Sequence, residues 1–172
     1  MRAGEILSLA ERAGIAPGVS VLDLCCGIAG PGRFITRELG CTYLGVDYSR
    51  SAIDIARERA GDLPCHFEVA RIPPLPPGRF DVVLLLETLL AFPDKEALVA
   101  EVAAALAPCG RFAFTLEEGA PLTEAERASM PDADTVWLTQ LEEMLGHLER
   151  AGLVVRRQDD LSASHRVLAL HA

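Results

Sequence analysis

A loop of small residues directly follows an apolar run near the start of the chain, and it is suited to binding an anionic ligand. The apolar run covers residues 19–24, the loop follows at residues 25–29, and a helix pattern begins at about Gly30. In an open α/β sheet this order places a tight backbone turn at the carboxyl edge of the first strand. Ligands bind at that edge, and the free amides of a helix N-terminus favour anionic groups.

An acidic residue ends the next predicted strand. Residues 42–46 form a short apolar strand pattern that ends in Asp47, about 20 residues after the glycine-bearing loop. A carboxylate at the end of the second strand can accept hydrogen bonds from both hydroxyls of a ribose. The loop and the acid together predict a pocket for a nucleoside-bearing cofactor.

Strand and helix patterns alternate along the rest of the chain. The connection at residues 159–164 is too short for a parallel crossover, so we expect the last strand pair to be antiparallel. We predict an α/β, doubly wound, mostly parallel seven-stranded Rossmann-like sheet with an antiparallel last strand and helices on both faces. Residues 117–134 are expected to form a loop with at most one helical turn. The predicted helices cover residues 4–14, 30–39, 50–60, 94–106 and 136–151, and the predicted strands residues 19–24, 42–46, 65–69, 80–86, 111–116, 153–158 and 165–170.

Composition narrows the class of protein. The 172 residues are 50% apolar and 24% charged, as expected for one globular domain over residues 1–172. The net charge of −9 argues against general nucleic-acid or anionic-membrane binding, which needs clustered Lys and Arg. No apolar run reaches the length of a membrane span and no secretory signal opens the chain, so we expect a cytoplasmic protein.

Five cysteines show no paired metal-ligand spacing, and we predict no metal site. Their odd number argues against a secreted disulfide framework, so we interpret them as free thiols that pack as small apolar residues. A nucleophilic or redox role stays open for Cys25 and Cys26, because both adjoin the predicted pocket.

Four segments, in this order and at these distances, resemble the motifs of class I S-adenosylmethionine-dependent methyltransferases, and most closely the small-molecule "type 11" group. The resemblance covers nearly the whole chain. It implies that S-adenosylmethionine is the cofactor and that a small molecule accepts the methyl group. The segments are Leu22-Asp23-Leu24-Cys25-Cys26-Gly27, Gly45-Val46-Asp47-Tyr48-Ser49, Arg79-Phe80-Asp81-Val82-Val83 and Leu106-Ala107-Pro108-Cys109-Gly110-Arg111-Phe112.

The resemblance assigns roles to particular residues. Asp23 and the backbone of residues 25–30 would hold the methionine portion, Asp47 the ribose hydroxyls, and Tyr48 would stack on or flank the adenine. Glu87, after the fourth strand, would lie beside the transferable methyl group, where it lines the pocket or acts as a general base. The full set of implied cofactor contacts is Asp23, Cys25, Cys26, Gly27, Gly30, Asp47, Tyr48, Ser49 and Glu87.

Three residues could contact the substrate, and each also has a simpler interpretation. Glu117 could recognise an amine or be a solvated loop charge, and Trp137 could form an apolar wall or pack in the core. His165 opens the last predicted strand and could face the pocket or the solvent. Asp23 likewise could brace the loop without touching the cofactor.

The chain departs from the family pattern at several positions. Cys25 stands where the family has glycine, and its Cβ would crowd the turn if φ is positive there. The acid that meets the adenine amino group is missing near Val69 or Ala70, and Cys109 replaces a turn glycine. Inserted helices that cover the substrate are also missing, so we expect the pocket to be open, completed by a second copy in a homodimer, or trimmed from a longer parent.

The leading hypothesis is methyl transfer from S-adenosylmethionine to N, O or C of a small molecule, a choice the sequence leaves open. The alternative is a non-catalytic module that binds S-adenosylmethionine or S-adenosylhomocysteine, or a truncated methyltransferase core. An NAD-dependent oxidoreductase is a third option, against which the terminal strand pair and the Asp-x-Cys-x-Gly spacing argue.

Overall fold

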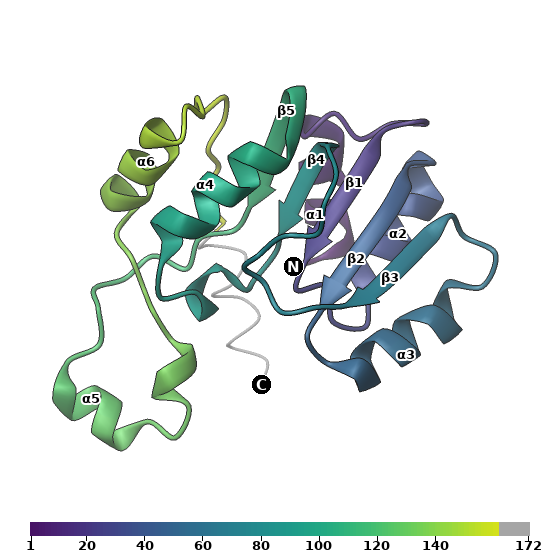
Figure 1. Cartoon of the computed structure of the whole chain (residues 1–172). Helices are drawn as coiled ribbons and strands as arrows, with labels where there is room; N and C mark the ends of the chain where they lie inside the picture. Colours follow the sequence, from purple (N-terminus) through teal and green to yellow (C-terminus); the bar gives the residue numbers. More distant parts are fainter. Residues whose placement is uncertain (162–172) are drawn as a thin grey trace.

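A five-stranded parallel sheet forms the centre of the molecule (Figure 1). The structure, a computed structural model, describes residues 1–161. Within them the strand order is β3-β2-β1-β4-β5, and every pairing is parallel. The order reverses between β1 and β4, which places the topological switch point where the sequence predicts the pocket. The strands are β1 (Ser20–Leu24), β2 (Thr42–Asp47), β3 (Cys65–Val69), β4 (Phe80–Leu85) and β5 (Leu106–Phe114).

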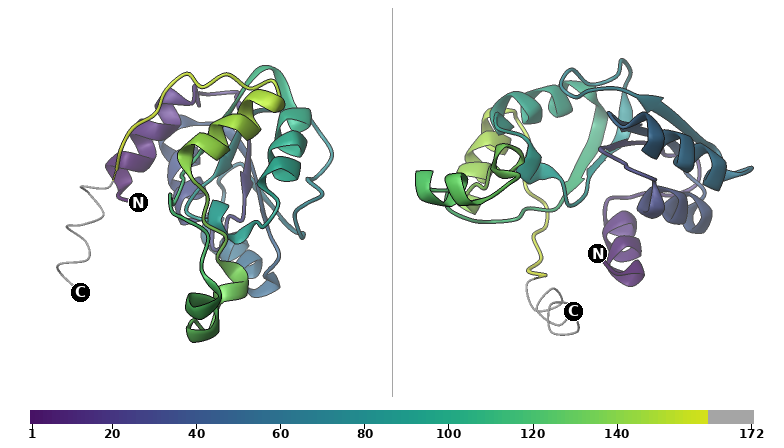
Figure 2. Two further views of the ribbon diagram at one scale, coloured as in Figure 1. Left: turned by 90° about the vertical axis from the view of Figure 1, so that its left-hand side faces the viewer. Right: turned by 90° about the horizontal axis from the view of Figure 1, so that it is seen from below.

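Helices cover both faces of the sheet, as Figure 2 shows from the side. Along β4 the side chains of Val82 and Leu84 pack into one core, whereas those of Val83 and Leu85 pack into the other. A strand that is apolar on both faces is typical of the centre of a parallel sheet. The first core lies under α1 (Ala3–Arg12), α2 (Gly30–Leu39) and α3 (Arg50–Ala60), and the second under α4 (Lys95–Ala105) and α6 (Leu141–Arg150).

Local sequence signals begin and end these helices where expected. Ser49 caps α3, because its hydroxyl accepts a hydrogen bond from the amide of Ala52. Asp94 caps α4 in the same way through the amide of Ala97. Gly40 ends α2 in the left-handed conformation that glycine adopts without strain. The helices that follow β2 and β4 therefore begin at side-chain caps that the sequence displays.

A small lobe, residues 120–136, projects beyond the carboxyl edge of the sheet next to β5 (Figure 1, lower left). It contains α5 (Glu124–Ser129) and the 3-10 turn η2 (Ala133–Thr135). Its two ends meet at a parallel bridge between Glu118 and Thr139. A second 3-10 turn, η1 (Leu89–Ala91), follows β4 beside the same edge.

Two predictions about the C-terminal third are wrong. Residues 153–158 do not form a strand; the segment runs toward α1 instead, where Asp159 pairs with Arg12 at 2.7 Å. The described sheet thus has five strands, not seven, and the predicted strand 165–170, including His165, lies outside the described residues. The predicted helix 136–151 begins only at Leu141, because other contacts hold the backbone before it. None of the described helices has the length and apolar character needed to cross a bilayer.

Candidate functional site

Asp47 joins the ends of the first two strands. Its side chain is only 8% exposed, and each carboxylate oxygen accepts a backbone amide, Oδ2 from Gly27 and Oδ1 from Ser49, both at 2.8 Å. An ionised carboxylate offers about four lone-pair sites, and these two bonds use two of them. The acid therefore fixes the loop after β1 and can still accept two hydroxyl groups.

The loop between β1 and α2 turns through left-handed backbone. Cys25, Gly27 and Ala29 have φ of 57°, 54° and 53°. The expected crowding at Cys25 is thus a real conformational cost, since a Cβ disfavours this region. At Gly27 a Cβ would meet no atom within 4 Å, and the same holds for Gly30 at the start of α2. The loop backbone faces open space at these two glycines, as an approaching ligand requires.

Asp23 is buried in β1 and bonds to the neighbouring strand β2. It is 3% exposed and accepts a hydrogen bond from the Tyr43 hydroxyl at 2.5 Å. Burial raises the pKa of Asp23 to about 7, a rise that the Tyr43 hydrogen bond opposes and the charge of Asp47 increases. The hydrogen bond ties β1 to β2, and whether Asp23 braces the loop or contacts the cofactor stays a prediction.

The two adjacent cysteines are poorly suited to nucleophilic chemistry. Burial, followed by the charges of Asp47 and Asp23, raises the pKa of the Cys25 thiol to about 12. Burial also raises the pKa of the Cys26 thiol, with Asp23 the next cause. The reactive form of cysteine is the thiolate. Both thiols therefore stay protonated near neutral pH and contribute packing and backbone geometry.

The last residue of β3 is not an acid, as the sequence indicates. The register pairs Asp47 with Val69 at the end of β3, and the amide of Ala70 donates to the carbonyl of Asp47. Glu68 lies one position earlier and pairs with Val46. Tyr48, next to Asp47, is 71% exposed and is free to flank a planar ring.

Glu87 follows β4 and begins a chain of polar contacts on the other side of the edge. Its backbone is left-handed, with φ of 57°, and its half-exposed carboxylate accepts from the N-terminal ammonium group of Met1 at 2.6 Å. Its amide donates to the Thr115 hydroxyl at 2.6 Å, and that hydroxyl donates to Glu117 at 3.4 Å. Thr115 thus connects the carboxyl ends of β4 and β5.

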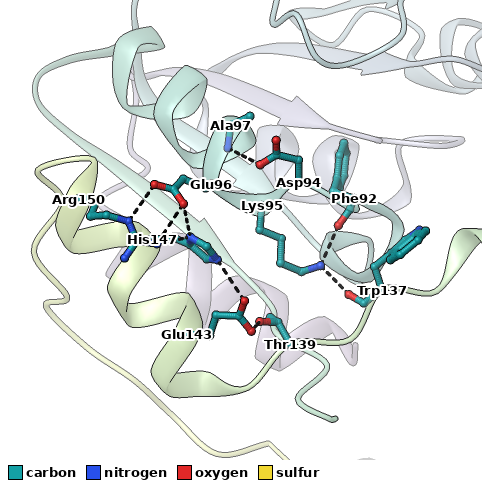
Figure 3. A network of polar contacts seen from close by, with 10 residues as sticks. All are labelled: Phe92, Asp94, Lys95, Glu96, Ala97, Trp137, Thr139, Glu143, His147 and Arg150. Carbon is teal, nitrogen blue, oxygen red and sulfur yellow. Dashed lines mark hydrogen bonds and ion pairs between the residues drawn. The ribbon is translucent and has the colours of Figure 1, made fainter. Parts of the chain in front are cut away.

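Lys95 extends this group of contacts to Trp137 (Figure 3). It is 5% exposed at the first turn of α4, and its Nζ donates to the carbonyls of Phe92 at 2.8 Å and Trp137 at 2.5 Å. Burial lowers the pKa of Lys95, while the charges of Glu143 and Glu117 oppose that change. Glu117 and Trp137 are therefore both neighbours of one buried ammonium group.

The structure brings most of the predicted site residues to one edge of the sheet. Asp47, Tyr48 and the loop glycines lie at the β1–β2 side, and Glu87, Glu117 and Trp137 lie at the β4–β5 side. Three polar partners of the predicted site residues were missed in the sequence. From the sequence alone, Lys95 would be expected to be a solvated helix residue. Tyr43 and Thr115 would be expected to be ordinary strand residues. An unusual cation in the first turn of a helix was the available signal for Lys95.

Comparison with known proteins identifies the family. The sequence profile described as "Methyltransferase domain" matches residues 21–110, which run from β1 into β5 and include Asp47 and Glu87 but not Glu117 or Trp137. The chain belongs to this family.

Relatives and solved structures of the family extend the comparison. Methyltransferase GfsG of Streptomyces halstedii is 28% identical over an alignment of 179 positions, which covers 95% of this chain and 64% of that protein. The 27-O-demethylrifamycin SV methyltransferase of Amycolatopsis mediterranei is 30% identical over 164 residues, 87% of this chain and 60% of that protein. The chain thus spans less than two thirds of the length of these relatives.

The fold matches as well. A solved structure of phosphoethanolamine N-methyltransferase 2 of Haemonchus contortus, in complex with S-adenosyl-L-methionine, superposes with a TM-score of 0.79 at 22% identity. The likeness covers 98% of this chain and 41% of that one, and it establishes a Rossmann-like methyltransferase fold.

Proposed function

We propose that the chain is an S-adenosylmethionine-dependent methyltransferase domain that acts on a nucleophilic atom of a small molecule. The observation that carries the proposal is the geometry of Asp47, which accepts the amides of Gly27 and Ser49 at the carboxyl end of β2 and has acceptor capacity for two further hydrogen bonds. Two adjacent sugar hydroxyls fit that pattern. Family membership supports the reaction type, and the relatives supply small-molecule methyltransferases as precedents.

The remaining residues on the β1–β2 side fit the other parts of the cofactor. The backbone at Gly27 and Gly30 faces open space at the start of α2, where a carboxylate is favoured by the helix N-terminus. Exposed Tyr48 would flank the adenine, and backbone groups near Val69 would take the place of the missing acid. Asp23 would act through the loop that it supports.

When bound, S-adenosylmethionine supplies an activated methyl group on a positively charged sulfur. The chain's own task is to hold that group and to align the acceptor with it. Glu87, half-exposed after β4, would line the acceptor side and could take a proton from a hydroxyl or ammonium acceptor. The buried, protonated thiols of Cys25 and Cys26 need no covalent role in such a direct transfer.

Calorimetric titration tests the cofactor assignment. We expect S-adenosylmethionine and S-adenosylhomocysteine to bind and NADH not to bind. Asp47→Ala should weaken binding by about 1.5–3 kcal/mol, the scale of hydrogen bonds to a charged group. Asp54→Ala, which removes an exposed acid on α3, is the matched control and should bind normally. Preferential binding of NADH would support an oxidoreductase instead.

A non-catalytic cofactor-binding module is the second candidate. The strained Cys25 turn and the acid-free end of β3 favour it, because both depart from the family pattern. A radiolabelled methyl-transfer assay over a panel of amine, hydroxyl and carbon acceptors separates the two. Binding of S-adenosylhomocysteine without transfer to any acceptor would support the module.

Several predictions from the sequence stay predictions. They are the single domain over residues 1–172 without a substrate cap, the cytoplasmic location, the lack of nucleic-acid and membrane partners, and completion of the pocket by a second copy. Analytical ultracentrifugation with and without S-adenosylhomocysteine would test the last of these.

A further inference from the structure

We infer that Lys95 is a positioning residue of the methyl-acceptor site, which holds Trp137 in place beside the turn that follows β4. The inference rests on the proposed function for the identity of that site. It adds a residue that the sequence motifs and the family resemblance do not mark. The proposed role concerns only the acceptor side of the pocket. In the described contacts, Lys95 touches neither the loop after β1 nor Asp47.

The location of Lys95 requires an explanation. A cation in the first turn of a helix meets the positive end of the helix dipole. Lys95 is the first residue of α4 and is almost fully buried, so burial adds a second cost. Favourable contacts of the ammonium group must compensate for the unfavourable helix dipole and for the loss of hydration. They are the carbonyls of Phe92 and Trp137 and the nearby carboxylates of Glu143 and Glu117.

These contacts fix Trp137 through both of its backbone groups. Its carbonyl accepts from Lys95, and its amide donates to the carbonyl of Leu90 in η1 at 2.8 Å. This pair of bonds ties residue 137 to the turn that follows Glu87 and Thr88. It also explains why α6 starts only at Leu141, since the carbonyl and amide of Trp137 are used outside a helix.

We call the two backbone hydrogen bonds of Trp137, to Lys95 and to Leu90, the clasp. The side chain of Trp137 joins this clasp to the lobe. The guanidinium of Arg127 lies 4.3 Å from the indole ring centroid, and the same group donates to the carbonyl of Ala133 at 3.0 Å. A cation over an indole face is a favourable contact. The lobe at residues 120–136 is therefore joined to the sheet through the Glu118–Thr139 bridge and through Trp137, and the Lys95 ammonium holds Trp137.

Trp137 is the only tryptophan in the chain, so its fluorescence reports on this clasp directly. The test compares wild type with Lys95→Met, which keeps the side-chain length but cannot donate. Glu96→Gln is the matched control, because it removes the adjacent exposed ion pair with Arg150 and leaves Trp137 untouched. Far-UV circular dichroism and the thermal midpoint establish that each variant is folded.

Acrylamide quenching of Trp137 and calorimetric binding of S-adenosylhomocysteine are then measured on the same samples. Loss of the clasp should raise the Stern–Volmer constant of Lys95→Met by about twofold or more, since local opening becomes easier. Its affinity for S-adenosylhomocysteine should stay within about twofold of wild type, because removal of an interaction that the ligand does not use costs no binding energy. Glu96→Gln should match wild type in both measurements.

Two results would overturn the inference. One is quenching in Lys95→Met equal to that in wild type. The other is an unchanged KM for a methyl acceptor in a Lys95→Met variant whose Trp137 is quenched more strongly. A positioning role predicts instead that this KM rises by about fivefold or more, while the KM for S-adenosylmethionine stays constant. Failure of wild type to bind S-adenosylhomocysteine would instead contradict the proposed function. The quenching result would still show whether Lys95 holds Trp137.

A measurement on wild type alone covers the case in which Lys95→Met does not fold. In hydrogen exchange, a peptide over residues 133–140 should be protected well above a peptide over residues 120–132. Trp137 gives its amide to Leu90, and the bridge at Thr139 closes the segment. Equal exchange in the two peptides would contradict the clasp.

Discussion

Asp23 should make the stability of the protein fall as the pH rises toward neutrality. The pKa of this carboxyl is about 7 in the folded chain and 3.8 as its ordinary value, chiefly because burial disfavours the charged form. Between these values the folded state keeps a proton that the unfolded state has lost. The gap corresponds to about 4 kcal/mol of unfolding free energy, at about 1.36 kcal/mol per tenfold change in proton affinity.

The sign and the pH window follow from that order. A raised folded-state pKa stabilises the fold fully below about pH 4, and the contribution declines until it is lost above about pH 7. Asp23→Asn removes the titration and keeps the shape, and its carbonyl oxygen can still accept from Tyr43. The free energy of unfolding of wild type minus that of the variant should therefore fall by about 4 kcal/mol between pH 4 and pH 7.5.

Urea unfolding followed by circular dichroism at half-unit pH steps measures this difference, because the other titrating groups cancel in the subtraction. Asp62→Asn makes the same substitution at an exposed acid and is the matched control. The reasoning would be refuted by a pH-independent difference for Asp23→Asn, which would mean that the buried carboxyl ionises as it does in the unfolded chain. A difference that grows with pH would refute it as well.

Three further predictions concern the loop and its surroundings. Gly32→Ala should destabilise the protein by about 3 kcal/mol in urea, because the added Cβ would lie 2.1 Å from the Tyr43 ring; a loss below about 1 kcal/mol would show that the helix moves away. Cys25→Gly should raise stability by about 0.5–1 kcal/mol by relieving a φ of 57°, with unchanged S-adenosylhomocysteine binding; weaker binding would give Cys25 a role of its own. Iodoacetamide at pH 8 should alkylate exposed Cys109 before Cys25, whose thiol has a pKa of about 12, and the reverse order by peptide mass analysis would contradict the burial argument.

The sequence was sufficient for the part of the fold that short-range patterns control. The strands at residues 20–24, 42–47, 65–69 and 80–85 lie where apolar runs and helix caps predict them. The crowding expected at Cys25 is confirmed by its positive φ. Such features depend on the periodicity and turn chemistry of neighbouring residues, which a single sequence displays.

Long-range contacts explain where prediction failed. The pattern of residues 136–151 is that of one helix, but Leu90 and Lys95 hold Trp137 outside it, and neither is close in sequence. Residues 153–158 have strand composition, yet the segment leads to the ion pair between Asp159 and Arg12 and forms no ladder. β5 also begins five residues earlier than its pattern indicates, directly after α4.

The central claim is that the carboxylate of Asp47 holds the sugar hydroxyls of the cofactor, and a double-mutant cycle measures it most directly. Calorimetry would compare S-adenosylhomocysteine with its 2′,3′-dideoxy analogue, each titrated into wild type and Asp47→Ala. The account predicts a coupling energy of about 1.5–3 kcal/mol between the carboxylate and the hydroxyls. Equal losses from Asp47→Ala for both ligands, and thus no coupling, would contradict it and would leave Asp47 as a brace for the loop alone.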